Sequence, residues 1–515
     1  MEIDTTKSIT KQFPRNLAAN VVYFLVNVIV GLLLVPFFIS TLGVAAYGLI
    51  PLATSVTGYV AIVVQSLNTA VTRFLTVDLQ REDYAGANRT FNTAFFGLTA
   101  VILLMVPIVM VVAYLIPVIF SVAPGQEQGA IFLFLGVCAA FLLRSWSGNF
   151  TVQLFAYNRL DLQNLVNLTN LVLQTGLIVL LFVLLGPDLA LVGGAYFAGA
   201  VAASVVSIIL ARRVCPHLKV SIHAFDRSLV RDLCGMGGWL VIDQIGALLL
   251  FQLDLVVVNL LFGATMAGEY AIALQWRILL HSIVGMLTGI LVPTVLVYYA
   301  QKQTDTLIKI TKSAVKLLGL AIALPAGLIC GFSPQLLTIW VGTEYASLAP
   351  LLVLLTAPFA ATMSVQPLFS INVAHNRVRV PGTMTILLGI ANLALAIIIP
   401  LITGWGYYGV AVAGAIILTF RHTLFVPWYT AKILKSRMID YQKCIFPGAF
   451  ALFIIGVAAA SLVAVTSFSS ILAIIIAGIG VTLVYGIVVL EMGLTSFEKQ
   501  LFRSYLPQRW KKIGN

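Results

Sequence analysis

Residues 271–291, AIALQWRILLHSIVGMLTGIL, are apolar enough to lie in lipid, yet they carry Arg277 near the middle and His281 one helical turn later. A guanidinium keeps its proton there, and placing it at the centre of a bilayer costs roughly 3 kcal/mol on insertion scales. Its planar fork donates two parallel, charge-assisted hydrogen bonds to a carboxylate or a phosphate. The arginine therefore predicts an intramembrane ion pair, an anion-binding site, or both.

Asp254 is the expected partner of Arg277. The apolar stretches on either side of residues 262–268 predict a helical hairpin whose turn is centred near Thr265 and Met266. Asp254 lies as far before this turn as Arg277 lies after it, which places both side chains at a similar depth. The pair can stabilise the second half of the chain, line a polar cavity, or do both, because intramembrane charges usually face a bundle interior or water.

A second carboxylate lies on the same predicted helix. Asp243 precedes Asp254 by eleven residues, or three helical turns, so both side chains project from nearly one face. Together they can form a path for a coupling cation. Alternatively, Asp254 is satisfied by its partner and Asp243 lies near the cytoplasmic interface. His281 can titrate near neutral pH, or it is a hydrogen-bonded structural residue.

The first half of the chain offers two further cations. Arg144, in FLLRSWSGNF, lies in the inner part of an apolar stretch beside Ser145, Ser147 and Asn149, which is typical of a cavity wall. Arg73 ends the second apolar stretch, where it can bind substrate or extend its side chain to the interface. Additional candidates of this type are Arg421 with His422, Asn20 and Asn27.

Composition identifies the elements that position these residues. The 515-residue chain is 60% hydrophobic and only 9% charged, against about 25% charged in soluble domains. Each crossing needs roughly 20 apolar residues, so the sequence has room for about fourteen transmembrane helices. We predict an all-α polytopic membrane protein.

The five scattered cysteines form no metal-binding or disulfide pattern, and no GxxxxGK[ST] phosphate loop occurs. We therefore expect no metal and no cofactor.

Charge distribution predicts the orientation in the membrane. The net charge is +12, and nearly all 30 basic residues lie in the termini and six loops, near residues 78–90, 156–163, 211–235, 300–312, 374–381 and 431–444. The alternate loops contain no Lys or Arg. By the positive-inside rule, the basic loops and both termini are cytoplasmic. The charge thus encodes topology, and we expect no nucleic-acid partner. The basic C-terminal tail, 492–515, predicts an interfacial helix on anionic lipid, with a disordered tail as the alternative.

Weak internal similarity predicts a repeat. Residues 37–55 resemble residues 257–275, and an Asn-Arg pair at 158–159 is repeated at 376–377. Each offset is near 220 residues, which predicts two parallel six-helix lobes followed by two extra helices. The predicted parts are a cytoplasmic tail (1–15), an N-terminal lobe (16–210), a cytoplasmic linker (211–235), a C-terminal lobe (236–430), two helices (445–491) and a basic tail (492–515).

The N-terminal region carries a family resemblance. Residues 20–79 contain a Leu-Gly-x-x-x-Tyr-Gly turn (Leu42, Gly43, Tyr47, Gly48) and an Ala-x-x-Arg ending (Ala70, Arg73). With the two six-helix halves, this pattern resembles the multidrug/oligosaccharidyl-lipid/polysaccharide exporter superfamily. The opening stretch looks like that of its bacterial polysaccharide flippases, and the likeness runs through essentially the whole chain.

This resemblance implies a transporter and not an enzyme. Flippases of this branch move undecaprenyl-diphosphate-linked oligosaccharide across the bacterial inner membrane for O-antigen (lipopolysaccharide) or exopolysaccharide synthesis. The implied fold is two lobes around a cavity that opens alternately to either side. Membrane lipids, a polysaccharide polymerase and a chain-length regulator are the implied partners. The cations available for the diphosphate are Arg277, Arg144 and Arg73.

Three alternatives remain. A cation-coupled multidrug exporter has the same fold, and Asp243 and Asp254 are the features that favour it. A lipid II flippase would carry several arginines in its first helices, whereas no basic residue occurs between Arg15 and Arg73. A membrane glycosyltransferase or polymerase would need a sizeable outer loop, but no predicted outer loop exceeds about 15 residues, the length of a simple connection.

Overall fold

The computed structural model describes residues 5–80, 82–230, 244–300, 303–375, 377, 379–466, 470–495 and 498–499, and every regular element in these ranges is helical. The chain divides into two compact units. Unit 1 comprises Met1–Ile272 and Gly382–Val410, and unit 2 comprises Ala273–Pro381 and Ala411–Asn515. The predicted all-α class is confirmed, whereas the boundaries of the predicted lobes and linker stay a prediction.

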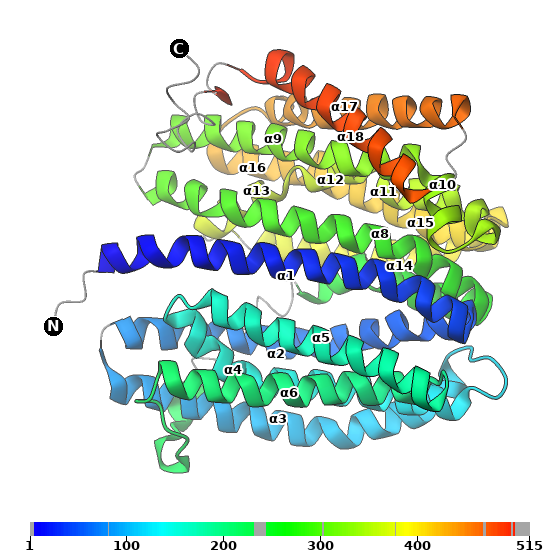
Figure 1. Cartoon of the computed structure of the whole chain (residues 1–515). Coiled ribbons are helices and arrows are strands. Elements are labelled where there is room, and N and C mark those ends of the chain that lie inside the picture. Colours follow the sequence, from blue (N-terminus) through cyan, green and yellow to red (C-terminus); the bar gives the residue numbers. More distant parts are fainter. Residues whose placement is uncertain are drawn as a thin grey trace. The chain divides into compact units, whose positions relative to one another are not determined.

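Unit 1 is built around α4 and α6. Its elements are α1 (Thr5–Leu42), α2 (Val44–Gln80), α3 (Tyr84–Ile119), α4 (Glu127–Ala156), α5 (Leu160–Leu185), α6 (Leu189–Val214), the 3-10 turn η1 (Ile222–Ala224), the first part of α8 (Leu253–Ala300), most of α14 (Arg379–Thr403) and the start of α15 (Tyr407–Thr419). α4 and α6 lie side by side, α5 packs on α6 and α1, and α2 packs on α4 (Figure 1).

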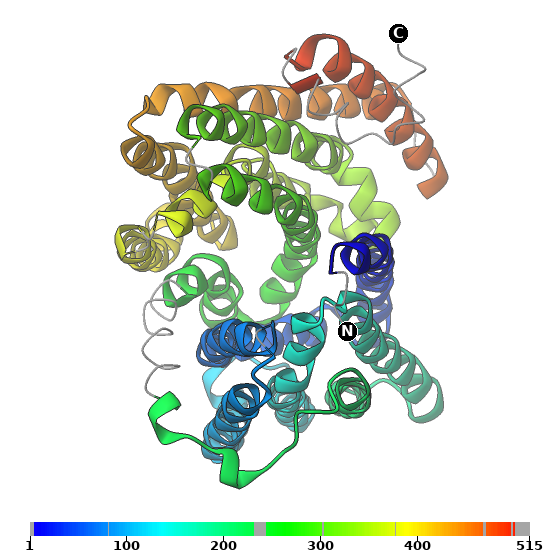
Figure 2. The ribbon, with the colours of Figure 1, turned by 90° about the vertical axis from the view of Figure 1, so that its left-hand side faces the viewer.

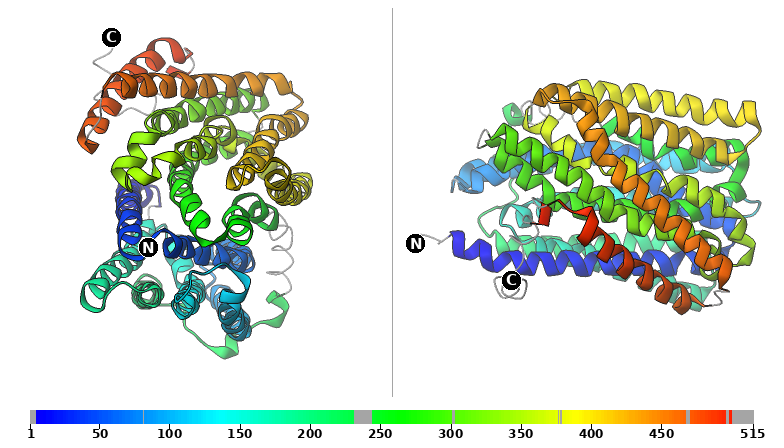
Figure 3. Two further views of the ribbon diagram at one scale, coloured as in Figure 1. Left: turned by 90° about the vertical axis from the view of Figure 1, so that its right-hand side faces the viewer. Right: turned by 90° about the horizontal axis from the view of Figure 1, so that it is seen from above.

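Unit 2 is built around α9 and α17. Besides the rest of α8 and α15, it contains α9 (Thr304–Gly331), α10 (Ser333–Trp340), η2 (Thr343–Leu348), α11 (Ala349–Thr356), α12 (Phe359–Met363), α13 (Gln366–Ala374), the π-helical turn η3 (Phe420–Phe425), α16 (Val426–Leu434), α17 (Met438–Val465), α18 (Ile471–Val488) and η4 (Val489–Gly493). α9 (green) and α17 (orange) run side by side (Figures 2 and 3).

Twelve helices in the described ranges are long and apolar enough to span a membrane. The sequence predicted about fourteen, and two of the predicted spans explain the difference. α2 is 37 residues long, but many side chains in its second half lie outside the described residues, and only Val44–Gly58 is recognised as an apolar segment. The seventh predicted span falls partly on residues 231–243, which also lie outside them, and its end is counted together with the eighth as the single helix Leu253–Thr288, although Gly263 separates the two. Those two spans stay predictions.

Small residues allow the central helices of each unit to approach closely. A Cβ added to Gly136 of α4 would lie 2.2 Å from the backbone oxygen of Gly193 in α6. In unit 2, a Cβ on Gly331 of α9 would lie 2.4 Å from the Cβ of Ala459 in α17. Close backbone packing is a main source of helix association where lipid removes the hydrophobic driving force. Glycine is therefore required at these helix crossings.

The two stretches that suggested an internal repeat form the same turn. Gly43 (φ +83°) separates α1 from α2, and Gly263 (φ +88°) breaks α8. Both adopt the left-handed region that glycine enters without steric strain. Five residues after each turn, Gly48 and Gly268 meet: a Cβ on Gly48 would lie 2.7 Å from the backbone nitrogen of Gly268. The hairpin turn predicted near Thr265 thus occurs two residues earlier, at Gly263.

The first part of the predicted linker is fastened to α3. The Asn88 side chain donates to the carbonyl of His217 (3.0 Å) and accepts from the backbone N–H of Lys219 (2.9 Å). Asn92 repeats the arrangement one turn later, donating to the Lys219 carbonyl (2.8 Å) and accepting from the Ser221 N–H (2.7 Å). The side chains of Asn88 and Asn92 thus form the hydrogen bonds with the backbone of residues 217–221 that a neighbouring β-strand would otherwise form. Figure 2 shows this segment, in green, beside α3.

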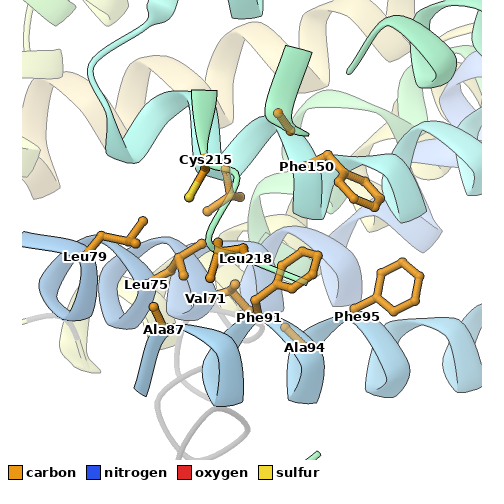
Figure 4. Packing of buried hydrophobic residues seen from close by; sticks show 12 residues of the cluster. Val71, Leu75, Leu79, Ala87, Phe91, Ala94, Phe95, Phe150, Cys215 and Leu218 are labelled. Atoms are coloured by element: carbon orange, nitrogen blue, oxygen red, sulfur yellow. The ribbon is translucent and has the colours of Figure 1, made fainter. Parts of the chain in front are cut away.

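A hydrophobic cluster holds the same end of unit 1 together (Figure 4). It joins α2, α3, α4, the end of α6 and the segment that follows α6 through Val71, Leu75, Leu79, Ala87, Phe91, Ala94, Phe95, Phe150, Val152, Ala211, Cys215 and Leu218. Trp146 packs against this cluster, and its indole N–H donates to the Thr99 hydroxyl (3.1 Å). Trp146 therefore belongs to the packing between α3 and α4.

The described start of the C-terminal tail forms a helix N-cap. The Glu498 carboxylate accepts from the backbone N–H of Thr495 (2.8 Å), and the Thr495 hydroxyl accepts from the N–H of Glu498 (3.3 Å). This reciprocal pair is a capping box, which starts a helix. Burial alone raises the pKa of Glu498, but hydrogen bonds from Lys316 of α9 and from Thr495 outweigh it and hold that pKa below its ordinary value. The predicted interfacial helix beyond residue 499 lies outside the described residues.

Candidate functional site

Arg144 lies deep within unit 1. It precedes Ala156, the last residue of α4, by twelve residues, or about 18 Å along the helix axis. One guanidinium nitrogen, Nη2, donates to Oδ1 of Asn167 on α5 (2.7 Å). The other, Nη1, is buried and has no hydrogen-bond partner among the described residues. The ion pairs found in the described ranges involve other cations.

The side chains that the described part of the chain places near this guanidinium, Asn167 and Tyr23, are polar and uncharged. Tyr23 of α1 lies within electrostatic range of Arg144. Ser147, which the sequence placed beside the arginine, instead accepts a hydrogen bond from Ser204 of α6 (3.0 Å) and connects the two helices. Arg144 is half-buried, and a charge withdrawn from water is costly unless a counter-charge or hydrogen bonds compensate it. The Arg144 environment is thus suited to receive an anion from outside the described chain.

A stripe of amide side chains continues from this point along α5. Its members recur at three- and four-residue spacing: Asn164, Asn167, Asn170 and Gln174. Asn164 donates to Asn20 of α1 (2.6 Å), Asn167 accepts from Arg144 of α4, and Gln174 hydrogen-bonds Tyr196 of α6. This stripe was absent from the sequence-based candidates, although amides at helical spacing in an otherwise apolar segment are a readable signal.

The end of α5 that is predicted to be cytoplasmic holds a compensated charge cluster. The Asp161 carboxylate accepts from Arg15 (2.7 Å), from Arg159 (3.0 and 3.1 Å) and from the Gln12 amide (3.0 Å). The carboxylate is buried, whereas Arg15 is largely exposed. This network ties the start of α1 to the α4–α5 turn. It contrasts with Arg144, which has neither a carboxylate nor a full set of acceptors among the described residues.

Asp254 lies in unit 1 and is only 2% exposed. Its Oδ2 is 3.4 Å from the hydroxyl of Tyr270, which follows the Gly263 turn. The neighbouring Glu269 accepts a hydrogen bond from Tyr407 (3.0 Å), whose ring packs edge-on against Tyr270. Glu269, Tyr270 and Tyr407 were absent from the sequence-based candidates, because single polar residues near a predicted helix end gave no pattern.

The second pair of predicted arginines lies in unit 2. Arg277, on α8, is 8% exposed, and His281 is exposed one turn later. Arg421 is 7% exposed, and its guanidinium lies over the ring of Phe369 (5.1 Å). The Arg421 backbone is in the π-helical turn η3, a geometry that often marks functional sites. Both buried arginines are thus held inside unit 2.

One predicted pairing and two predicted site residues stay predictions. Asp254 and Arg277 belong to different compact units, so their pairing is a proposal. The Arg73 backbone lies in α2, but its side chain is outside the described residues, as is the whole of Asp243. The structure therefore brings Arg144 into contact with the α5 amide Asn167. For Asp254, Arg277 and His281 it gives the position of each residue within its own unit.

Comparisons of the amino-acid sequence identify a family and a relative of this chain. Residues 14–298, more than half of it, match the family described as "Polysaccharide biosynthesis protein". The "Uncharacterized membrane protein EpsK" of Bacillus subtilis (strain 168) is 29% identical over 435 residues, which cover 84% of this chain and 85% of that protein.

Solved structures show the fold. An inward-facing multidrug resistance MATE family transporter of the MOP superfamily matches with a TM-score of 0.64 at 15% identity, over 82% of this chain and 99% of that one. The bent form of the Vibrio cholerae MATE transporter VcmN matches with a TM-score of 0.53 at 18% identity, over 87% of this chain and 99% of that one. At these identities the likeness establishes a MATE-like fold.

Proposed function

Because the chain belongs to the polysaccharide biosynthesis protein family and has the MATE-like fold, we propose that it is a lipid-linked oligosaccharide flippase. Its substrate is an undecaprenyl-diphosphate-linked oligosaccharide, which it moves by alternating access from the cytoplasmic to the outer leaflet of the bacterial plasma membrane. The product serves a surface polysaccharide of the O-antigen or exopolysaccharide type. Both termini face the cytoplasm, and a polymerase and a chain-length regulator act on the exported product.

The observation that carries this proposal is the environment of Arg144. The diphosphate and the sugars must cross about 30 Å of hydrocarbon, whereas the polyprenyl tail can stay in lipid. A protein that moves such a headgroup needs a fixed cation away from its own carboxylates. Arg144 has this property, because Nη1 has no hydrogen-bond partner among the described residues. In the proposal, this nitrogen donates to a phosphate oxygen.

Arg277 supplies a second cation, held partly by Asp254. In this scheme Arg73 contacts the headgroup near the cytoplasmic side, and Asp243, Asp254 and His281 belong to the path of a coupling ion. The observation that favours a second candidate, a cation-coupled drug exporter, is that Asp254 is buried beside Tyr270. A drug exporter, however, gains nothing from an uncompensated guanidinium, because its typical substrates are organic cations that Arg144 repels.

Cells that lack this chain should lose surface polymer and accumulate the lipid-linked precursor. Expression of the wild type should restore the polymer and remove the accumulated precursor.

Removing one member of a buried ion pair costs roughly 3 to 5 kcal/mol, whereas neutralising both members is often tolerated. The informative variant is therefore Arg277→Gln with Asp254→Asn. We expect it to insert and fold without restoring polymer, and Arg277→Lys to restore part of it. Normal polymer from the double variant would show that the pair is scaffolding.

A further inference from the structure

The Gly263 turn of α8 is held on one side by the start of α2. Gly268 follows this turn by five residues, as Gly48 follows the Gly43 turn, and both Gly48 and Gly268 are buried. A Cβ on Gly48 would lie 2.7 Å from the backbone nitrogen of Gly268, and a Cβ on Gly268 would overlap the carbonyl oxygen of Val44. The two backbones therefore touch, and neither position has room for a side chain.

A second contact holds the other side of the same turn. Asn259 precedes Gly263 by four residues and is completely buried. Its side chain accepts a hydrogen bond from the backbone N–H of Ser121 (2.9 Å) and donates one to the Ser121 carbonyl (3.2 Å). Ser121 lies in the loop between α3 and α4. The turn is thus held by α2 on one side and by the α3–α4 loop on the other.

Both contacts join segments that are far apart in the sequence. α2 and the α3–α4 loop belong to the predicted N-terminal lobe, whereas Asn259 and Gly268 belong to the predicted C-terminal lobe, although all of them lie in unit 1. The three connections involved, near residues 40–46, 121–129 and 262–268, contain no Lys or Arg. The positive-inside rule predicts that such connections lie outside the cell. The contacts therefore connect the two predicted lobes at their predicted outer ends.

These contacts are of a kind that can open and close. Asn259 holds Ser121 by two neutral hydrogen bonds, each of which contributes little net free energy to a fold. Because Ser121 is exposed, water can replace Asn259 as the partner of its backbone when the contact separates. A conformational equilibrium that a ligand can shift needs only a modest free-energy difference between its states. The closed arrangement is therefore specific in its geometry but weakly held.

We propose that these two contacts, the Gly48–Gly268 crossing and the Asn259–Ser121 hydrogen bonds, are the outer gate of the transporter and are closed in this structure. The headgroup leaves toward the outer leaflet only after they separate, and the cycle continues only after they close again. Glycine at positions 48 and 268 is then required for closure. This inference rests on the proposed transport by alternating access and adds the contacts that separate and close in each cycle.

The test measures whether a thiol below the outer gate becomes reachable from outside. Gln252 precedes Gly263 by eleven residues, or about 16 Å along a helix, and its exposed side chain lies against Gly58 of α2. We expect Gln252→Cys to react slowly with a membrane-impermeant maleimide that is added to spheroplasts of an expressing strain. Labelling of the same protein without this substitution is subtracted, which removes the five native cysteines from the signal.

Two variants should open the outer gate. Gly268→Ala adds a Cβ that meets backbone, which cannot rotate away as a side chain can. Asn259→Ala removes two neutral hydrogen bonds, a loss equivalent to about tenfold in an equilibrium constant. In both variants we expect external labelling of Gln252→Cys to rise about tenfold, and in Gly268→Ala we expect flipping in liposomes to fall about tenfold. Gly285→Ala is the control, because a Cβ at this other position of α8 meets nothing within 4 Å, and it should change neither rate.

Size-exclusion profiles in detergent show which variants are folded. External labelling at the wild-type rate in folded Gly268→Ala or folded Asn259→Ala protein would overturn the outer gate. If only Gly268→Ala misfolds, Asn259→Ala decides, and misfolding of both would assign the contacts to a permanent scaffold and would also overturn the gate. If both variants label faster but the wild type flips no lipid-linked oligosaccharide, the gate stands and the flippase function is wrong.

Discussion

Arg144→Gln should lower the rate of lipid-linked oligosaccharide transport by about 10- to 100-fold, the equivalent of one charge-assisted hydrogen bond of roughly 1.5–3 kcal/mol. Glutamine can still bond Asn167 but carries no charge. We expect the protein to remain folded and to melt at or above the wild-type temperature, because Nη1 of the arginine is buried without a partner among the described residues. Flipping in liposomes and thermal unfolding in detergent measure the two effects.

A second variant tests the same charge by pairing it with a carboxylate instead of removing it. Asn167→Asp places a carboxylate next to Nη2, which is 2.7 Å from Asn167 Oδ1 in the structure. The new ion pair should neutralise Arg144, stabilise unit 1 and reduce transport to a similar extent. A structural arginine predicts the reverse for Arg144→Gln: lower stability with transport per folded molecule unchanged. That result would remove Arg144 from the substrate path.

Gly193→Leu should prevent unit 1 from folding. A Cβ at this position would lie 2.5 Å from the carbonyl oxygen of Phe132 and 2.8 Å from the Cα of Leu133, both in the backbone of α4. Backbone cannot rotate away as a side chain can, so α4 and α6 would have to separate. Overpacking typically costs about 1–3 kcal/mol, and we expect a loss of about 3 kcal/mol or more at this crossing.

The adjacent residue provides the control. Gly194 belongs to the same helix and is exposed, and a Cβ there meets nothing within 4 Å. Gly194→Leu makes the same chemical change one residue away and should leave folding intact, with a small gain from helix propensity. Size-exclusion profiles in detergent would compare the two variants. Monodisperse Gly193→Leu protein with wild-type stability would contradict the described α4–α6 packing.

The adjacent glycines illustrate what the sequence could not determine. Gly193 and Gly194 both lie in an apolar stretch, and no local pattern distinguishes the one that contacts α4 from the one that is exposed. The choice depends on where α4 lies, which is a tertiary fact. By contrast, hydropathy was sufficient to predict an all-α membrane protein, because each crossing leaves a long apolar run.

The candidate site could be predicted in part. Arg144 was identifiable because a cation deep in an apolar helix is costly and rare, and its cost implies a role. Its real neighbours, Asn167 and Tyr23, come from two other helices, whereas Ser147, close by in sequence, bonds α6 instead. The α5 amides were missed, although their three- and four-residue spacing is a readable signal in the sequence. That Nη1 of Arg144 has no hydrogen-bond partner among the described residues depends on where α1 and α5 lie, which is a tertiary fact.

The most direct test of the central claim is the leaflet distribution of a fluorescent undecaprenyl-diphosphate-linked oligosaccharide in liposomes that contain the purified full-length chain. With a proton or sodium gradient imposed, quenching from outside should reach nearly all of the probe in these vesicles. In protein-free vesicles, and in those with Arg144→Gln, it should reach only the share in the outer leaflet over the same time. If wild-type vesicles also expose only the outer-leaflet share, while the same preparation drives cation-dependent efflux of a dye, the chain is a drug exporter and not a flippase.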